Sequence, residues 1–260
     1  MIEKRMPAVF IGHGSPMNTL EHNRYTESWN TFGASVGTPR AILAISAHWY
    51  IGGTAVTAMK KPRVIHDFSG FPQELFDFDY PADGAPDVAH EIAEIARPTT
   101  VTLDDSNWGI DHGTWSVLAH MFPQANVPVV QLSINATESI DYHVNLGAKL
   151  APLMAKGILI VGSGNVVHNL GRIDWSATDR GYEWAERFDA AARLQMHDAP
   201  GEIGRLMQHS DYALSVPTPE HFLPLAYISG IAAAVNQTPE VMIGGCALGS
   251  LSMTSFTVAG

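Results

Sequence analysis

Short apolar runs recur along the chain and alternate with segments that have the period of an amphipathic helix. The runs predict strands at 7–11, 41–47, 127–134 and 157–161, and more weakly at 54–59 and 250–258. The helical period predicts helices at 22–36, 86–96, 114–121, 138–155, 180–197 and 221–235. Continuous apolar strands that alternate with helices are typical of an α/β fold, with a mostly parallel central sheet and helices on both faces.

Two further segments differ from this alternation of apolar strands and helices. Residues 250–258 alternate between apolar and polar side chains, which predicts an antiparallel strand at the edge of the sheet. Residues 60–86 are rich in Pro, Gly, Asp and aromatic residues, and ordered loops of this length usually serve a site, often as a lid. Since no repeat, linker or low-complexity tract divides the chain, we predict one domain over residues 1–260.

Composition and charge exclude several classes of partner. The net charge is −11 and the 15 basic residues are scattered, so nucleic acid and anionic membranes should be repelled. The longest apolar stretches fall short of the roughly 20 residues that a membrane helix needs. Cys246 is the only cysteine, which excludes an internal disulfide and a thiolate cluster. We therefore expect a cytoplasmic globular protein that binds neither nucleic acid nor membranes, and the composition leaves its oligomeric state open.

Three histidines stand where predicted strands end. His13 follows the strand at 7–11, His48 follows the strand at 41–47, and His168 follows the strand at 157–161 after the turn GSGN. Ligands of open α/β sheets bind beyond the carboxyl ends of the strands, where the loops converge. The sequence therefore predicts that three imidazoles from distant parts of the chain meet at one edge of the sheet.

Two further histidines precede predicted helices. His221 lies in PTPEHFLPL and His112 in GIDHGTW. The positive end of a helix dipole disfavours imidazolium, which leaves a ring nitrogen free to bind a metal. The adjacent carboxylates of Asp111 and Glu220 are candidate hydrogen-bond partners for these rings.

A lone histidine in such a place is usually structural, but the joint occurrence of five predicts a shared metal site. Among the other histidines, His66 stays undecided. The rest are expected at the surface or in satisfied positions, namely His22, His90, His120, His143, His197 and His209.

Other chemistries have weaker support in the sequence. The turns GHGSP and GSGN lack the closing Lys-Ser/Thr of a phosphate-binding loop and do not complete a dinucleotide fingerprint. Ser15 and Ser163 lack the nucleophile-elbow pattern of serine hydrolases. The shared metal site leaves two readings open: a zinc hydrolase in which a multi-histidine site activates water, and a metal-binding module without activity.

Eight motifs in series give the chain a family resemblance. They are GHGSPMN, SAHW, HDFSGFPQELFDFDYPADGAP, GIDHGTWSVL, PVVQLSI, GSGNVVHNL, PTPEHFLPL and GSLSM. In this order, and over essentially the whole chain, they resemble the class III extradiol ring-cleavage dioxygenases, in particular the 4,5-DOPA dioxygenase branch.

The resemblance implies a non-haem Fe(II) enzyme that opens a catechol ring beside its two hydroxyls with O₂, giving a semialdehyde. It implies that His13, His48 and His221 bind the metal. It implies that His168 is the acid/base residue and lies close enough to the metal to act as a fourth ligand in some states. It implies that His112 is a second active-site histidine.

The expected ligand set differs from the one that many non-haem iron oxygenases use. Many non-haem iron oxygenases use two histidines and a carboxylate, whereas here the third position is His221, with Glu220 just before it. A set of imidazoles also suits Zn²⁺, so we expect the purified protein to carry zinc even where iron is the working metal. A carboxylated substrate would require a cation, for which Lys60, Lys61 and Arg63 are candidates.

Overall fold

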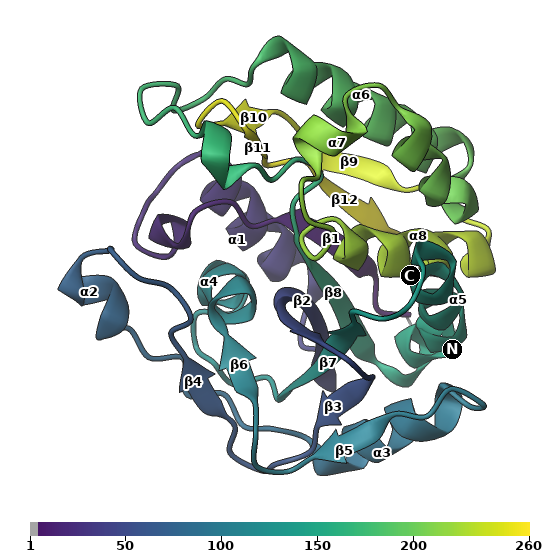
Figure 1. Ribbon diagram of the computed structural model, residues 1–260. Coiled ribbons are helices and arrows are strands. Elements are labelled where there is room, and N and C mark those ends of the chain that lie inside the picture. The colour runs from purple at the N-terminus through teal and green to yellow at the C-terminus, as the bar shows by residue number, and fades with distance from the viewer. Residues whose placement is uncertain (1–4) are drawn as a thin grey trace.

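A mixed eight-stranded sheet runs through the computed structural model, which describes residues 5–260 (Figure 1). In spatial order its strands are β5 (Thr102–Asp104), β3 (Ala55–Thr57), β7 (Val129–Asn135), β2 (Ala41–Ile51), β8 (Ile158–Gly164), β1 (Ala8–Gly12), β12 (Ser255–Val258) and β9 (Glu240–Ile243). Two small sheets flank it, one from β10 (Cys246–Ala247) and β11 (Leu251–Ser252), the other from β4 (Arg63–Ile65) and β6 (Gly109–Asp111).

The central strands β7, β2, β8 and β1 are parallel to one another. Their side chains alternate between two apolar cores: Ala8 and Phe10 of β1 pack on one face, while Val9 and Ile11 pack on the other. A strand with both faces buried reads as an unbroken apolar run, which is why these four strands were recognisable in the sequence. The predicted α/β fold is confirmed.

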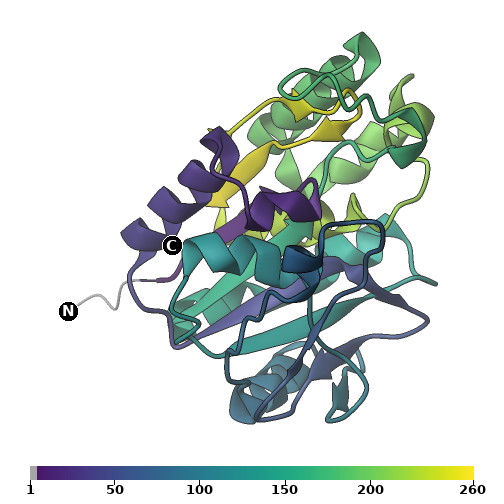
Figure 2. The ribbon, with the colours of Figure 1, turned by 90° about the vertical axis from the view of Figure 1, so that its left-hand side faces the viewer.

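Helices cover both faces of the sheet. One face carries α1 (Arg24–Val36) and α4 (His112–Met121), which pack against each other, as Figure 2 shows from the side. The other face carries α3 (Pro86–Ile95), α5 (Ile140–Leu150) and α8 (Leu223–Val235). The remaining helical segments are α2 (Gln73–Phe76), α6 (Glu183–Asp198), α7 (Tyr212–Ser215), η1 (Pro16–Thr19), η2 (Ala151–Lys156), η3 (Leu170–Arg172) and η4 (Pro200–Gln208).

The C-terminal strand differs from the prediction. Residues 250–258 form two strands, β11 and β12, because the chain turns between them: the Thr254 amide donates to Ser252 Oγ and the Met253 amide to Gly245 O. β12 is antiparallel as predicted, but it lies between β1 and β9, so it is not the edge strand. β9 forms that edge.

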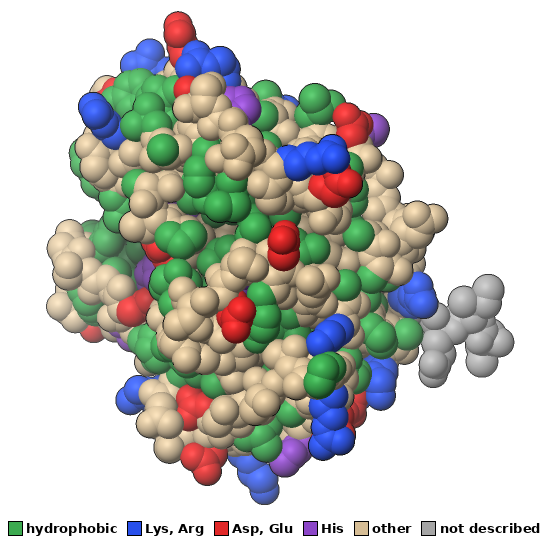
Figure 3. Space-filling model, turned by 45° about the vertical axis from the view of Figure 1, so that its right-hand side comes forward, with side chains coloured by type: hydrophobic (Ala, Val, Ile, Leu, Met, Phe, Trp, Pro, Cys, Tyr) green, Lys and Arg blue, Asp and Glu red, His purple; other side chains and the backbone are tan. Residues whose placement is uncertain are grey.

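The surface carries charges of both signs. On the face shown in Figure 3, Lys and Arg side chains are interspersed with Asp and Glu. Within residues 5–260, no helix is both long and apolar enough to cross a bilayer.

Candidate metal centre and its cavity

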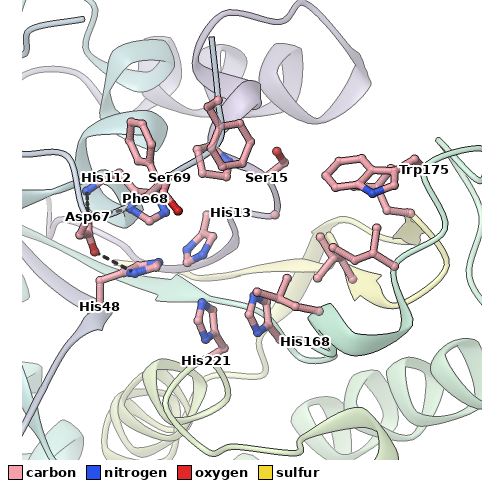
Figure 4. Close-up of a pocket in the computed structure, with 17 residues that line it drawn as sticks. His13, Ser15, His48, Asp67, Phe68, Ser69, His112, His168, Trp175 and His221 are labelled. Atoms are coloured by element: carbon pink, nitrogen blue, oxygen red, sulfur yellow. Dashed lines mark hydrogen bonds and ion pairs between the residues drawn. The ribbon is translucent and has the colours of Figure 1, made fainter. Parts of the chain in front are cut away.

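Five histidines line one cavity of about 290 Å³ at the carboxyl ends of β1, β2 and β8 (Figure 4). They are the five that the sequence singled out: His13, His48, His112, His168 and His221. The topology explains the convergence, because β2, β8 and β1 are parallel neighbours and their carboxyl ends open to the same side.

His13 follows β1 directly, and its tautomer is fixed by its neighbour. The Ser163 hydroxyl donates its single proton to the Gly113 carbonyl, so Ser163 Oγ can only accept from the His13 ring. His13 Nδ1, 2.9 Å from Ser163 Oγ, therefore carries the proton. The lone pair of His13 is left on Nε2.

His48 lies within β2, which runs on to Ile51 instead of ending at residue 47 as predicted. The register with β7 shifts between Ile45 and Tyr50, and this irregularity includes His48. Its Nδ1 is 3.0 Å from Asp67 Oδ2, while its Nε2 is buried and has no hydrogen-bond partner among the described residues. Gly113 makes room for the ring, since a Cβ there would lie 2.6 Å from His48 Cδ2.

His221 lies two residues before α8, near the start of the helix where it was expected. Its Nδ1 donates to Glu220 Oε1 over 3.2 Å. Its carbonyl accepts from the Asn165 amide and lies so close to Gly164 that a Cβ at that glycine would be 2.2 Å from the oxygen. Gly164, the second glycine of the GSGN turn, thus allows the segment carrying His221 to reach the end of β8.

The nitrogens of these three rings can share one cation. Ligand atoms of His13, His48 and His221 all lie within 4.8 Å of one another. Burial, together with the neighbouring imidazoles, lowers the pKa values of His13 and His221 well below the usual histidine value, so both rings are neutral. Burial also disfavours charge on His48, but Asp67 and Asp111 outweigh it and raise the pKa of His48. The same negative field favours a divalent cation.

His168 stacks on His221, with ring centroids 3.4 Å apart and planes inclined by 6°. Its backbone amide donates to the Ser215 carbonyl, which fixes the chain where the ring enters the cavity. Burial lowers the pKa of His168 to about 4. The ring is therefore neutral near pH 7 and able to accept a proton.

His112 is the first residue of α4, and its carboxylate partner differs from the one predicted. Its Nδ1 donates to Asp67 Oδ1 over 2.7 Å. The predicted partner, Asp111, is fully buried and caps α4 instead: its carboxylate accepts from the Thr114 amide and from the Ser46 hydroxyl. Because these donors and Gln131 Nε2 engage Asp111, its carboxylate makes no hydrogen bond to the His112 ring among the described residues.

Asp67 is the functional residue that sequence reasoning missed. Burial disfavours its charge, but the hydrogen bonds from His112 and His48 prevail and hold its pKa below the usual carboxyl range. The undecided His66 beside it has a structural role, since its Nε2 is 2.8 Å from the Phe78 carbonyl and its ring packs on Trp115. In the sequence, Asp67 was marked only as an acidic residue of the loop 60–86, within the motif that begins at His66.

Apolar side chains form the rest of the cavity wall. Of the loop aromatics, Phe68 and Phe71 line the cavity, where Leu170, Ile173, Trp175, Leu248 and Leu251 join them. Within residues 5–260 no lysine or arginine lines it. The candidate cations lie elsewhere: Lys61 pairs with Asp83 at 2.8 Å and Arg63 donates to the Asn107 carbonyl.

Comparison with known proteins places the chain in a family. Residues 8–242 match the family model of the catalytic LigB subunit of aromatic ring-opening dioxygenases. The chain belongs to the LigB family. The resemblance read from the eight motifs is thereby confirmed at the level of the family.

Named relatives cover nearly the whole chain. A protein of Escherichia coli K12 named 4,5-DOPA dioxygenase extradiol is 46% identical, over 99% of this chain and 96% of its own length. A protein of the same name from Beta vulgaris is 34% identical over 90% of this chain and 89% of its own. A crystal structure of an uncharacterized protein from Escherichia coli K12 shares the fold with a TM-score of 0.85, at 42% identity, and covers 98% of this chain and 100% of that one.

LigB dioxygenases depend on a metal, and the donor set of this chain fits one. His13, His48 and His221 each commit Nδ1 to a neighbouring oxygen, from Ser163, Asp67 and Glu220 respectively. Metal-binding histidines are usually held in this way, with the second nitrogen fixing the tautomer and ring orientation. Nε2 of His48 is buried and has no hydrogen-bond partner within residues 5–260, so its lone pair is free for a bound cation. Three imidazole nitrogens suit Fe(II) and Zn(II) alike.

Proposed function

We propose that this LigB protein is an Fe(II)-dependent extradiol dioxygenase that opens the ring of a DOPA-like catechol with O₂ and yields a semialdehyde. The observation that carries the proposal is the convergence of three imidazole nitrogens, with two more imidazoles over the same cavity. A zinc hydrolase needs only the three ligands and a water, which leaves the other two imidazoles without a role. The two further imidazoles suit a substrate that both gives up and takes back protons.

His13, His48 and His221 hold the metal in this proposal. When bound there, the metal supplies Lewis acidity and electron exchange with catechol and O₂. Because the three ligands are neutral when they bind, they leave the positive charge of the ion for the two hydroxyl oxygens of the substrate to neutralise. Since the same nitrogens suit zinc, we expect zinc in protein purified without added iron.

His168 and His112 move and hold protons. Neutral His168 accepts a proton from a catechol hydroxyl as the substrate binds, and later returns one to the opening ring. His112 has its Nδ1 committed to Asp67, so its Nε2 is the atom available to substrate or oxygen. The bond that breaks joins a hydroxylated ring carbon to its unhydroxylated neighbour. Both oxygen atoms of O₂ remain in the product, one in the aldehyde and one in the carboxylate.

The apolar wall orients the ring and excludes water. Phe68 and Phe71 stand beside the imidazoles, while Ile173 and Leu251 belong to the remaining wall of the cavity. A flat aromatic ring fits such a wall, and a dry cavity strengthens the electrostatic interactions within it. Since Cys246 is a free thiol, we place this activity in the reducing cytoplasm.

Oxygen consumption tests the proposal. Protein loaded with Fe(II) without oxygen is mixed with DOPA and other catechols in an oxygen electrode while visible absorbance is recorded. We expect equimolar O₂ uptake and a yellow semialdehyde. No uptake across the panel would overturn the proposal. Ester hydrolysis by the zinc-loaded protein without O₂ uptake would point to the hydrolase, and metal binding without either activity would point to a non-catalytic module.

A further inference from the structure

A single carboxylate joins the metal side of the cavity to its proton-transfer side. Asp67 lies in the segment between β4 and α2, and its side chain is 21% exposed. Its Oδ2 is 3.0 Å from Nδ1 of His48 on β2, and its Oδ1 is 2.7 Å from Nδ1 of His112 on α4. Figure 4 shows both contacts as dashed lines, with Asp67 between the two rings.

A carboxylate in this position allows only one arrangement of protons on two neutral rings. An ionised carboxylate accepts hydrogen bonds and donates none, so both imidazoles must carry their proton on Nδ1. The lone pairs of His48 and His112 are then both on Nε2. The backbone amide of His112 also donates to Oδ1, over 3.2 Å, which fixes the carboxylate against the start of α4.

We propose that Asp67 is a positioning residue that sets the Nδ1–H tautomers of His48 and His112 together. The inference rests on the proposed function, in which His48 binds the metal and His112 faces the substrate. With the opposite tautomer, His48 would direct a proton at the cation, and His112 would present a donor to the cavity instead of an acceptor. One side chain thus prepares two rings that belong to different secondary-structure elements.

The same residue ties the loop to the metal centre. Phe68, directly after Asp67, and Phe71 in the same loop line the cavity, and the Phe68 ring centroid lies 5.3 Å from that of His112. When Asp67 holds both imidazoles, this aromatic part of the wall is held in place as well. Loss of the carboxylate should therefore affect metal affinity, ring tautomer and substrate binding together.

Substitution of Asp67 by asparagine tests the tautomer directly. An amide has one acceptor oxygen, and its NH₂ group favours an unprotonated nitrogen opposite, so only one of the two rings can keep its Nδ1 proton in place. We expect long-range ¹H–¹⁵N spectra of the metal-free protein at pH 9 to show Nδ1–H for both His48 and His112 in the wild type. At least one ring should change in Asp67→Asn. His48→Gln and His112→Gln proteins assign the two signals.

Zinc affinity, measured by competition with a chelator, gives a second readout that does not require turnover. We expect about 10- to 100-fold weaker zinc binding for Asp67→Asn. Asp79→Asn, at an exposed position of the same loop region, is the matched control and should bind zinc like the wild type. Unchanged tautomers together with zinc affinity within about three-fold of the wild type would overturn the proposal.

A pair of longer variants keeps the test decisive if Asp67→Asn does not fold. Asp67→Glu retains two acceptors, whereas Asp67→Gln has the same shape with one. Zinc binding at least about ten-fold tighter in the glutamate variant supports the assignment, and equal affinities contradict it. Because neither readout uses catechol or O₂, failure of the proposed function would appear separately, as wild-type protein that binds zinc normally but does not consume oxygen after loading with iron.

Discussion

The two walls of the cavity are built differently. The imidazole wall (His13, His48, His112, His168 and His221) stands on or near the ends of β1, β2, β8, α4 and α8, and hydrogen bonds or ring stacking hold its members. The apolar rim (Leu170, Ile173, Trp175, Leu248 and Leu251) lies mostly on short segments outside the central sheet. Its members Leu170 and Trp175 are 61% and 66% exposed.

The difference separates two tasks. Chemistry requires atoms held to within a fraction of an ångström, which buried strand ends and paired side chains provide. Substrate selection is better placed on exposed segments, whose side chains can change without disturbing the core. If the cavity divides in this way, substitutions in the two walls must fail in different ways.

Removal of a metal ligand from the imidazole wall should have the largest effect. We expect His13→Ala to bind zinc at least about 100-fold more weakly and to show no detectable O₂ uptake, since the loss of a direct ligand exceeds the loss of an outer partner. Metal analysis after gel filtration and chelator competition measure the change. His90→Ala, at an exposed position on α3, is the control and should retain both properties. A His13→Ala protein that still holds an equivalent of metal tightly would refute the assignment of this ligand.

Loss of His168 should separate chemistry from metal binding within the same wall. We expect His168→Ala to retain the metal and to lower kcat about 10²- to 10⁴-fold, because the proton acceptor is removed while the three ligands stay. Steady-state kinetics with the iron-loaded protein, together with metal analysis, decides the outcome. If the variant loses its metal, His168 is a ligand instead of a base.

The imidazole wall was predictable because its signals are local in the sequence. Each of His13, His48 and His168 follows an apolar run, and a run of that kind specifies a buried parallel strand whose end has a known direction. The four central strands and the helices that cover them were found for the same reason. β9 was missed, since an exposed edge strand does not require an unbroken apolar run.

The hydrogen-bond partners of this wall were only partly predictable. Glu220 does contact its neighbour His221, because the two are adjacent in the chain. Asp111 is also adjacent to a histidine, but the start of α4 engages its carboxylate as a helix cap. Asp67 is far from His112 in sequence, and only the fold of an irregular loop brings them together. The position of Asp67 depends on tertiary structure, which the periodicity of the sequence does not predict.

The apolar rim should respond in KM and leave the metal untouched. We expect Trp175→Ala to raise the KM for a catechol about five-fold, which corresponds to about 1 kcal/mol of lost apolar contact at the mouth of the cavity. Zinc affinity and kcat should stay near wild-type values. Leu194→Ala, which removes an exposed leucine on α6 outside the cavity lining, is the control. A fall in kcat without a change in KM would place Trp175 with the chemistry and break the division between the walls.

The charge of the substrate's side chain should have the smallest effect on KM. Measuring this effect tests whether the rim is the wall that selects the substrate. Within residues 5–260 no lysine or arginine lines the cavity, while Glu21 lines the adjoining hollow that shares Trp175 with it. Because the whole chain has a net charge of −11, the cavity should favour a catechol with an amine on its side chain over one with a carboxylate. We expect a KM about three-fold lower for dopamine than for 3,4-dihydroxyphenylpropionate at low salt, with zwitterionic DOPA between them. Because exposed charges are screened, the difference should shrink as ionic strength rises. A lower KM for the acid would mean that a cation outside the described lining reaches the substrate, and selection would then depend on more than this rim.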